Sequence, residues 1–91
     1  DPKDSYAHNN RGNARQDKGD LEGALRDYDE ALRLDPKLSF AYKNRGLARQ
    51  AKGDRDGALA DLQRYLDLGG GEEYNDRAAV EQVIRELRQK R

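Results

Sequence analysis

Apolar residues recur at intervals of three and four along much of the chain, the spacing that places side chains on one face of a helix. Between residues 21 and 34 this stripe consists of Leu21, Ala24, Leu25, Tyr28, Ala31 and Leu32. Between residues 55 and 68 it consists of Ala58, Leu59, Leu62, Tyr65 and Leu66. Further helices are predicted just before each stripe, over residues 5–18 and 38–52. The pattern therefore predicts two helical hairpins.

Residues with turn and capping chemistry separate the two helices of each hairpin. Gly19 and Gly53 follow the first helices, where a left-handed residue commonly ends a helix and costs glycine little. Asp20 and Asp54 come next, and their carboxylates can accept from the free N–H groups of the following helix. Pro36 lies where the first hairpin should stop. These signals place the turns between the stripes.

The two hairpins are copies of one another. Residues 5–38 and 39–72 align without gaps and are identical at 17 of 34 positions. The shared segments read N-R-G-x-A-R-Q-x-K-G-D and G-A-L-x-D. The start, Asp1-Pro2-Lys3, recurs as Asp35-Pro36-Lys37 and resembles the tail of a preceding repeat. A 34-residue period predicts a stack of helical repeats, and we expect the chain to be a piece of a longer protein or an engineered chain.

The pattern changes after residue 68. The glycines at 69–71 predict a flexible break, and a fifth helix is predicted to start near Asn75 or Asp76, either of which can cap it. Its apolar face consists of Val80, Val83, Ile84 and Leu87. A helix with one apolar and one polar face suits the end of such a stack. We therefore expect one all-α domain over 1–91, with five helices, repeats at 5–38 and 39–72, and a capping helix at 75–90.

Composition narrows the function classes. Of 91 residues, 40% are charged, but Lys+Arg and Asp+Glu balance at 18 each, which argues against a nucleic-acid binder. The absence of cysteine excludes thiolate zinc sites and cysteine nucleophiles. We expect no metal or other cofactor, no catalytic residues and no membrane span. Without a signal-peptide core the sequence sets no compartment, and a cytoplasmic location is the default.

The repeated residues resemble the tetratricopeptide repeat family. Gly12 and Gly46 match its glycine in the first helix, Ala24 and Ala58 its small residue in the second, and Tyr28 its later aromatic residue. The family's early tryptophan is replaced by His8 and Tyr42, its leucine before the glycine by Arg11 and Arg45, and a late small residue by Tyr65. Because Asp27 and Asp61 also recur, we predict that Arg11 pairs with Asp27 and Arg45 with Asp61, and that Tyr65 fills the space of a further repeat.

The resemblance implies an α-solenoid that binds a protein or peptide partner in a concave groove formed by the first helix of each repeat. The expected groove residues are Tyr6, Asn9, Asn10, Asn13, Phe40, Lys43, Asn44 and Leu47, with Gln16 and Gln50 on the same face. Asparagine both donates and accepts, so a row of it can pair with a peptide backbone.

Other readings follow from the same residues. Asn13 and Asn44 match two positions of the family's carboxylate clamp, which grips acidic tails of heat-shock chaperones, but Asn9 replaces its lysine, and Tyr74 and Ala78 stand near its two further basic positions. The groove asparagines are equally consistent with a solvated face. The alternative function is a scaffold that stacks on a neighbouring repeat or on a second copy as a homo-oligomer, and nucleic-acid binding ranks last.

Overall fold

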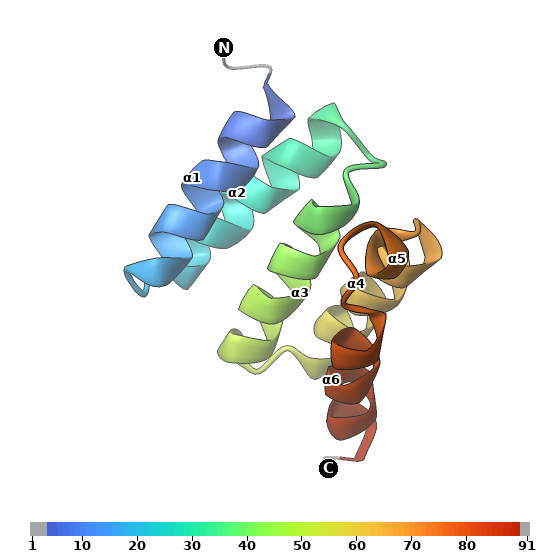
Figure 1. The fold of residues 1–91 in the computed structure, drawn as a ribbon. Helices are drawn as coiled ribbons and strands as arrows, with labels where there is room; N and C mark the ends of the chain where they lie inside the picture. Colours follow the sequence, from blue (N-terminus) through green and yellow to red (C-terminus); the bar gives the residue numbers. More distant parts are fainter. Residues whose placement is uncertain (1–3, 90–91) are drawn as a thin grey trace.

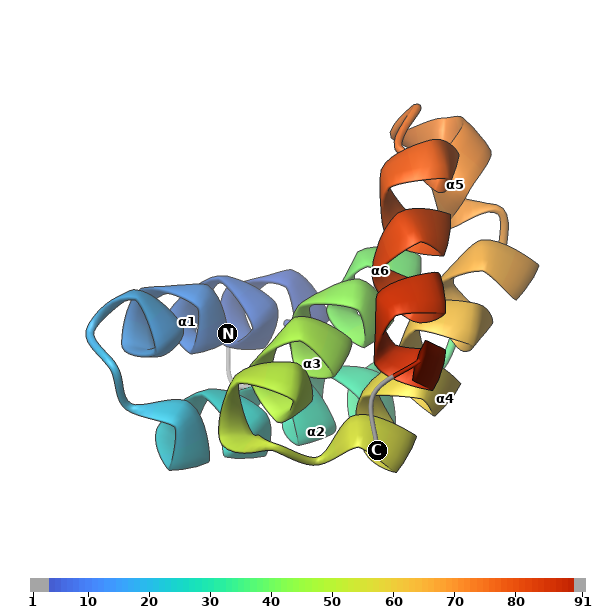
Figure 2. The same cartoon turned by 90° about the horizontal axis from the view of Figure 1, so that it is seen from below.

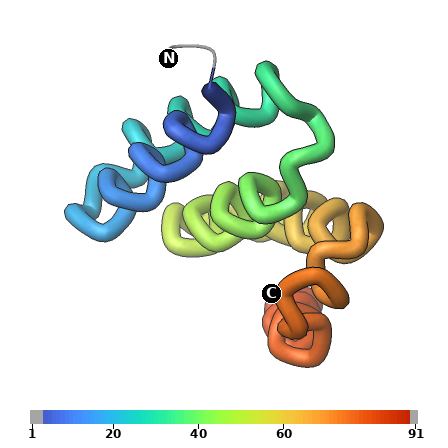
Figure 3. Tube along the Cα trace, turned by 45° about the horizontal axis from the view of Figure 1, so that its top comes forward, coloured from blue at the N-terminus to red at the C-terminus, as the bar shows by residue number. Residues whose placement is uncertain are grey.

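The structure, a computed structural model, describes residues 4–89 and is all-helical over that range. Its main helices are α1 (Ser5–Asp17), α2 (Leu21–Leu34), α3 (Ser39–Lys52), α4 (Arg55–Asp67) and α6 (Arg77–Gln89), and a short α5 (Gly70–Glu73) precedes the last. The hairpin α1–α2 stacks on α3–α4 through α2 and α3 (Figure 1). The second hairpin is turned relative to the first (Figure 3).

The prediction of an all-α repeat fold is confirmed. The prediction of five helices is wrong by one, and the recurring Asp1-Pro2-Lys3 lies outside the described residues.

The turns within the hairpins follow from the predicted cap chemistry. Gly19 and Gly53 adopt φ values of 86° and 94°, the left-handed region. Asp20 accepts from the N–H of Gly23 at 2.9 Å, and Asp54 makes the same contact in the second repeat. Both carboxylates satisfy donors that the helix itself leaves unpaired. The same local chemistry thus gives closely similar turns in the two copies, although α1 ends one repeat position earlier than α3.

Glycine allows the two helices of a hairpin to approach closely. A Cβ on Gly12 would lie 2.7 Å from the ring of Tyr28, which is fully buried in α2. A Cβ on Gly46 would lie 3.1 Å from the side chains of Asp61 and Leu62 in α4. The absence of a side chain at both positions therefore allows the close approach, and the first repeat uses the space for an aromatic ring.

Ion pairs to a buried aspartate join the helices of each hairpin, as predicted. Arg11 donates to Asp27, with Nη2 2.7 Å from Oδ1. Arg45 donates to Asp61, with Nη2 2.9 Å from Oδ1. The sequence analysis missed two further donors, one per repeat: Arg15 reaches Asp27 and Arg49 reaches Asp61. Each carboxylate therefore accepts from two guanidinium groups.

One arginine also joins the two repeats. Arg45 Nη1 lies 3.0 Å from Oδ1 of Asp29, which belongs to α2 of the first repeat. Its side chain is 18% exposed, whereas that of Arg11, the equivalent residue in α1, is 56% exposed. Arg45 thus fixes the register between the repeats as well as within one.

The glycine run after α4 forms the start of a short helix, α5, and not the flexible break that we expected. Gly69 is left-handed (φ 87°), and Gly70 and Gly71 are buried in α5. The ring of Tyr65 lies so close over Gly70 that a Cβ there would be 2.1 Å from it. Side chains at Gly70 and Gly71 would collide with the residues packed on them. Glycine here permits close packing.

The last helix starts later than predicted but covers the expected surface. Asn75 has a φ of 53°, so α6 begins at Arg77. Its buried face consists of Val80, Ile84 and Leu87, which pack with Leu62, Tyr65 and Leu66 of α4. Tyr65 is fully buried at this junction.

The interior consists of three clusters. One joins α2 to α3 and contains Ala24, Tyr28 and Ala48. A second joins α2 to α3 and contains Ala31, Leu32, Leu38 and Ala41. The largest lies between α4 and α6 and contains Ala58, Leu62, Tyr65, Leu66, Val80, Ile84 and Leu87.

No helix in residues 4–89 is both long and apolar enough to cross a bilayer.

Burial of Tyr28 predicts a loss of stability at high pH. Burial, with a smaller effect of Asp17 and Asp27, raises the pKa of Tyr28 to about 12 from an ordinary 10. Between these values the unfolded chain releases a proton that the folded chain retains, so the free energy of unfolding falls as pH rises. We expect Tyr28 to lower the free energy of unfolding by up to about 1.4 kcal/mol per pH unit over this range.

Urea unfolding at pH 9 and pH 11 measures this effect. Tyr28→Phe removes the titrating group, so its stability should fall less over that interval. Equal losses in the wild type and the variant would show that Tyr28 does not carry the dependence.

Candidate functional site

The first helices of both repeats and α6 form one face of the molecule, which we call the front face. It is turned to the viewer in Figure 1, and α2 and α4 lie behind it (Figures 1 and 2). The eight predicted groove residues lie on α1 and α3, and the structure brings several of them together. Asn44 donates to Asn9 at 3.0 Å across the two helices, and the rings of Tyr6 and Phe40 lie 5.4 Å apart.

The asparagines of this face differ in access. Asn10 is exposed, whereas Asn13 and Asn44 are half-buried. The Tyr28 hydroxyl donates to the Asn13 amide oxygen at 2.6 Å. Asn9 is 1% exposed, so the expectation that it lines an open surface is wrong. Its amide oxygen accepts the hydrogen bond from Asn44, and this bond holds α1 against α3.

Aromatic side chains form a row that runs from the beginnings of α1 and α3 to the ends of α5 and α4. Tyr6 contacts Phe40 as above, Phe40 meets Tyr74 edge-on with centroids 6.2 Å apart, and Tyr74 stacks on Tyr65 at 6.4 Å. Tyr6 and Tyr74 are exposed by 57% and 48%. Tyr74 was not among the predicted site residues. The 34-residue period that separates Tyr6 from Phe40 also separates Phe40 from Tyr74, and could have indicated it.

An apolar cavity of about 140 Å³, which we call the apolar slot, opens between α3, α4 and α6. Its walls are almost entirely apolar, and the residues that line it are Lys43, Leu47, Leu62, Asp76, Ala79, Val80 and Val83. Two of the predicted groove residues, Lys43 and Leu47, thus contribute to it. The contribution of α6 could not be seen in the repeat pattern, because α6 breaks that pattern.

A charged network lies beside the slot. Lys43 Nζ lies 2.5 Å from Oδ2 of Asp76, and the Tyr65 hydroxyl donates to Oδ1 of the same carboxylate at 2.7 Å. Burial alone would raise the pKa of Asp76, but the hydrogen bonds from Lys43 and Tyr65 outweigh it and hold that pKa below its ordinary value. Burial, together with the bond to Asp76, raises the pKa of Tyr65 well above its ordinary value. Asp76 is therefore a carboxylate with both oxygens in use.

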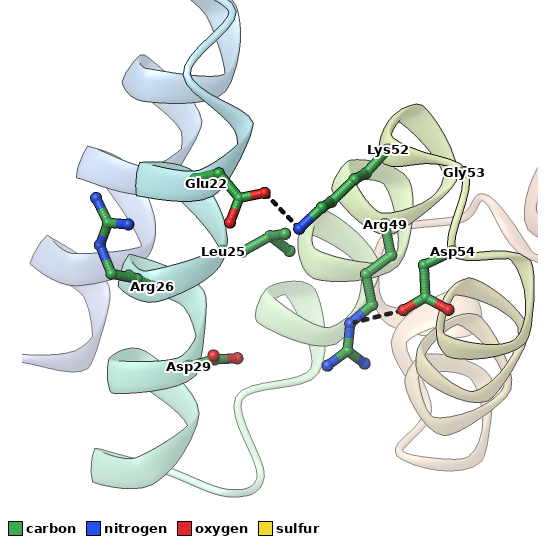
Figure 4. Close-up of a pocket in the computed structure, with 8 residues that line it drawn as sticks. All are labelled: Glu22, Leu25, Arg26, Asp29, Arg49, Lys52, Gly53 and Asp54. Carbon is green, nitrogen blue, oxygen red and sulfur yellow. Dashed lines mark ion pairs between the residues drawn. The ribbon is translucent and has the colours of Figure 1, made fainter.

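A larger cavity than the slot, about 540 Å³, lies between α2 and the turn from α3 to α4 (Figure 4). Its lining residues are Glu22, Leu25, Arg26, Asp29, Arg49, Lys52, Gly53 and Asp54. Lys52 pairs with Glu22, and Arg49 lies 3.8 Å from Asp54. With three acidic and three basic side chains, this cavity offers no net charge to a ligand.

Within residues 4–89 no cluster of three or more His, Asp or Glu side chains could hold a metal ion.

Comparison with known proteins identifies the repeat. The family profile described as tetratricopeptide repeat matches residues 5–38. The fold is similar to that of the first TPR of Spaghetti (RPAP3), solved with that protein bound to the HSP90 peptide SRMEEVD, with a TM-score of 0.85 and 26% sequence identity. The match covers 98% of this chain and 67% of that one. No curated protein matches in sequence.

Proposed function

Since the chain belongs to the tetratricopeptide repeat family, we propose that it binds an extended peptide segment of a partner protein on the front face. Domains of this family and fold are typically protein-interaction modules without enzymatic activity. The similar domain of RPAP3 is bound to a seven-residue peptide, which supports the same mode of binding here.

The apolar slot is the observation that carries the proposal. Its volume of about 140 Å³ is below the ~300 Å³ at which small-molecule pockets usually begin, and suits a single aliphatic side chain. The surrounding front face offers amides at Asn10, Asn44 and Gln50, which can both donate to and accept from a peptide backbone. A side chain in the slot would give affinity, and the amides would align the chain around it.

Filling the slot tests the proposal. Ala79 is exposed and lines the slot, so in Ala79→Phe the ring should occupy the space meant for the peptide side chain. The probe is acetyl-SRMQQVN-amide, in which every carboxyl group of the RPAP3-bound peptide is replaced by an amide. We expect fluorescence anisotropy to show binding to the wild type and at least a roughly tenfold loss in Ala79→Phe, equivalent to ~1.4 kcal/mol.

The adjacent position supplies the control. Ala78 is exposed on the same helix but does not line the slot, so Ala78→Phe adds the same ring without blocking the cavity. Its affinity should equal that of the wild type, and urea unfolding should show that both variants remain folded. A wild type that does not bind the probe, or equal affinity in Ala79→Phe, would contradict the proposal.

A further inference from the structure

We infer that Asp76 makes the front face prefer peptides without negative charge. Asp76 already pairs with Lys43, the cation that a carboxylate of the peptide would otherwise bind. The inference rests on the proposed peptide-binding function and adds the class of peptide that the site selects. It concerns a residue that lies on neither repeat and that the 34-residue pattern does not indicate.

Lys43 is the only charged side chain among the eight predicted groove residues. Its ammonium group lies 2.5 Å from Asp76 and 5.7 Å from the centre of the Tyr65 ring. The side chains of Lys43 and Asp76 are 33% and 19% exposed, so solvent screens the pair less than it screens a fully exposed one. The cation that could attract an acidic peptide is therefore neutralised within the chain.

Asp76 is also held in place before any peptide arrives. The Tyr65 hydroxyl donates to its second oxygen at 2.7 Å, and Tyr65 is fully buried. An incoming carboxylate would lose conformational freedom on binding, whereas Asp76 is already ordered. Once displaced from Lys43, Asp76 would remain nearby, and its negative charge would repel the peptide carboxylate. Both effects favour peptides that bring an uncharged group to Lys43.

Asp76→Asn removes the charge with little change in shape. The asparagine amide oxygen can still accept from Tyr65, and asparagine is as suitable as aspartate before the first turn of α6. Glu81→Gln is the matched control, because it removes one negative charge from the same helix. Glu81 pairs with Arg77 at 3.4 Å and does not line the apolar slot. The comparison separates a local effect at Lys43 from a change in net charge.

The experiment measures the affinity of wild type, Asp76→Asn and Glu81→Gln for acetyl-SRMEEVD and for acetyl-SRMQQVN-amide. We expect Asp76→Asn to bind the acidic peptide about tenfold more tightly than the wild type, a gain larger than any change in its affinity for the amide peptide. The gain should shrink as salt is added. Glu81→Gln should change either affinity by less than about twofold.

The outcomes separate this inference from the proposed function. If the amide peptide binds but Asp76→Asn improves the acidic peptide no more than Glu81→Gln does, the peptide site stands and the role of Asp76 is disproved. If neither peptide binds any of the three proteins, the peptide site and the role of Asp76 fall together.

Discussion

Asp61→Ala should lower the free energy of unfolding by about 3 kcal/mol, the range found when one partner of a buried ion pair is removed. The Asp61 side chain is 4% exposed and accepts from both Arg45 and Arg49. Without it, two guanidinium groups remain close together between α3 and α4 with no carboxylate at the centre. Urea unfolding monitored by circular dichroism measures the loss.

Asp29→Ala is the control for this prediction, since Asp29 also bonds Arg45, at 3.0 Å. Its side chain is 60% exposed, so its removal should cost less than about 1 kcal/mol. A similar loss in both variants would mean that burial does not decide the strength of these pairs. The two substitutions therefore test whether the contact within the repeat outweighs the contact between repeats.

Gly70→Ala should cost about 2–3 kcal/mol, the upper part of the range for overpacking. The new Cβ would lie 2.1 Å from the Tyr65 ring. That ring is fully buried, and its hydroxyl is bonded to Asp76 and lies 2.9 Å from the Gly70 carbonyl oxygen. The collision would have to move Tyr65, α5 or the start of α6.

The neighbouring glycine separates collision from backbone strain. Gly69 has a φ of 87°, but a Cβ there would meet no described atom within 4 Å. Gly69→Ala should therefore cost about 1 kcal/mol, the penalty of a left-handed conformation alone. Unfolding midpoints in urea rank the two variants. A Gly70→Ala protein as stable as Gly69→Ala would show that the Tyr65 ring can move aside cheaply.

The parts of the fold that could be predicted from the sequence depend on local chemistry that is present twice. Gly19 and Gly53 end helices, and Asp20 and Asp54 cap the next ones, because the residues concerned lie within one turn of each other. The pairing of Arg11 with Asp27 was also predictable, since both residues recur with the same spacing in the second repeat. Because these residues recur at the same position of both repeats, they can be distinguished in the sequence from the many other charged residues.

The unpredicted parts depend on how distant segments meet. The helical glycines of α5 are explained by what packs on them, the Tyr65 ring on Gly70 and Arg77 with Leu66 on Gly71, and no spacing rule describes these contacts. Asn9 has the sequence spacing of a groove residue, but it is buried and hydrogen-bonded to Asn44 of the other repeat. Asp76 acquires its position at the slot only because α6 crosses α3 and α4. Each of these features needs the packed chain.

The division of the interior into three clusters affects how the chain opens. Each cluster is shared by neighbouring helices only, so loss of contacts around Tyr28 need not disturb the side chains around Leu62 and Ile84. The two ends of the molecule can therefore loosen independently. A partner lying across α1, α3 and α6 would bridge these separately opening units, and would make them cooperate in a way that the chain's own core does not.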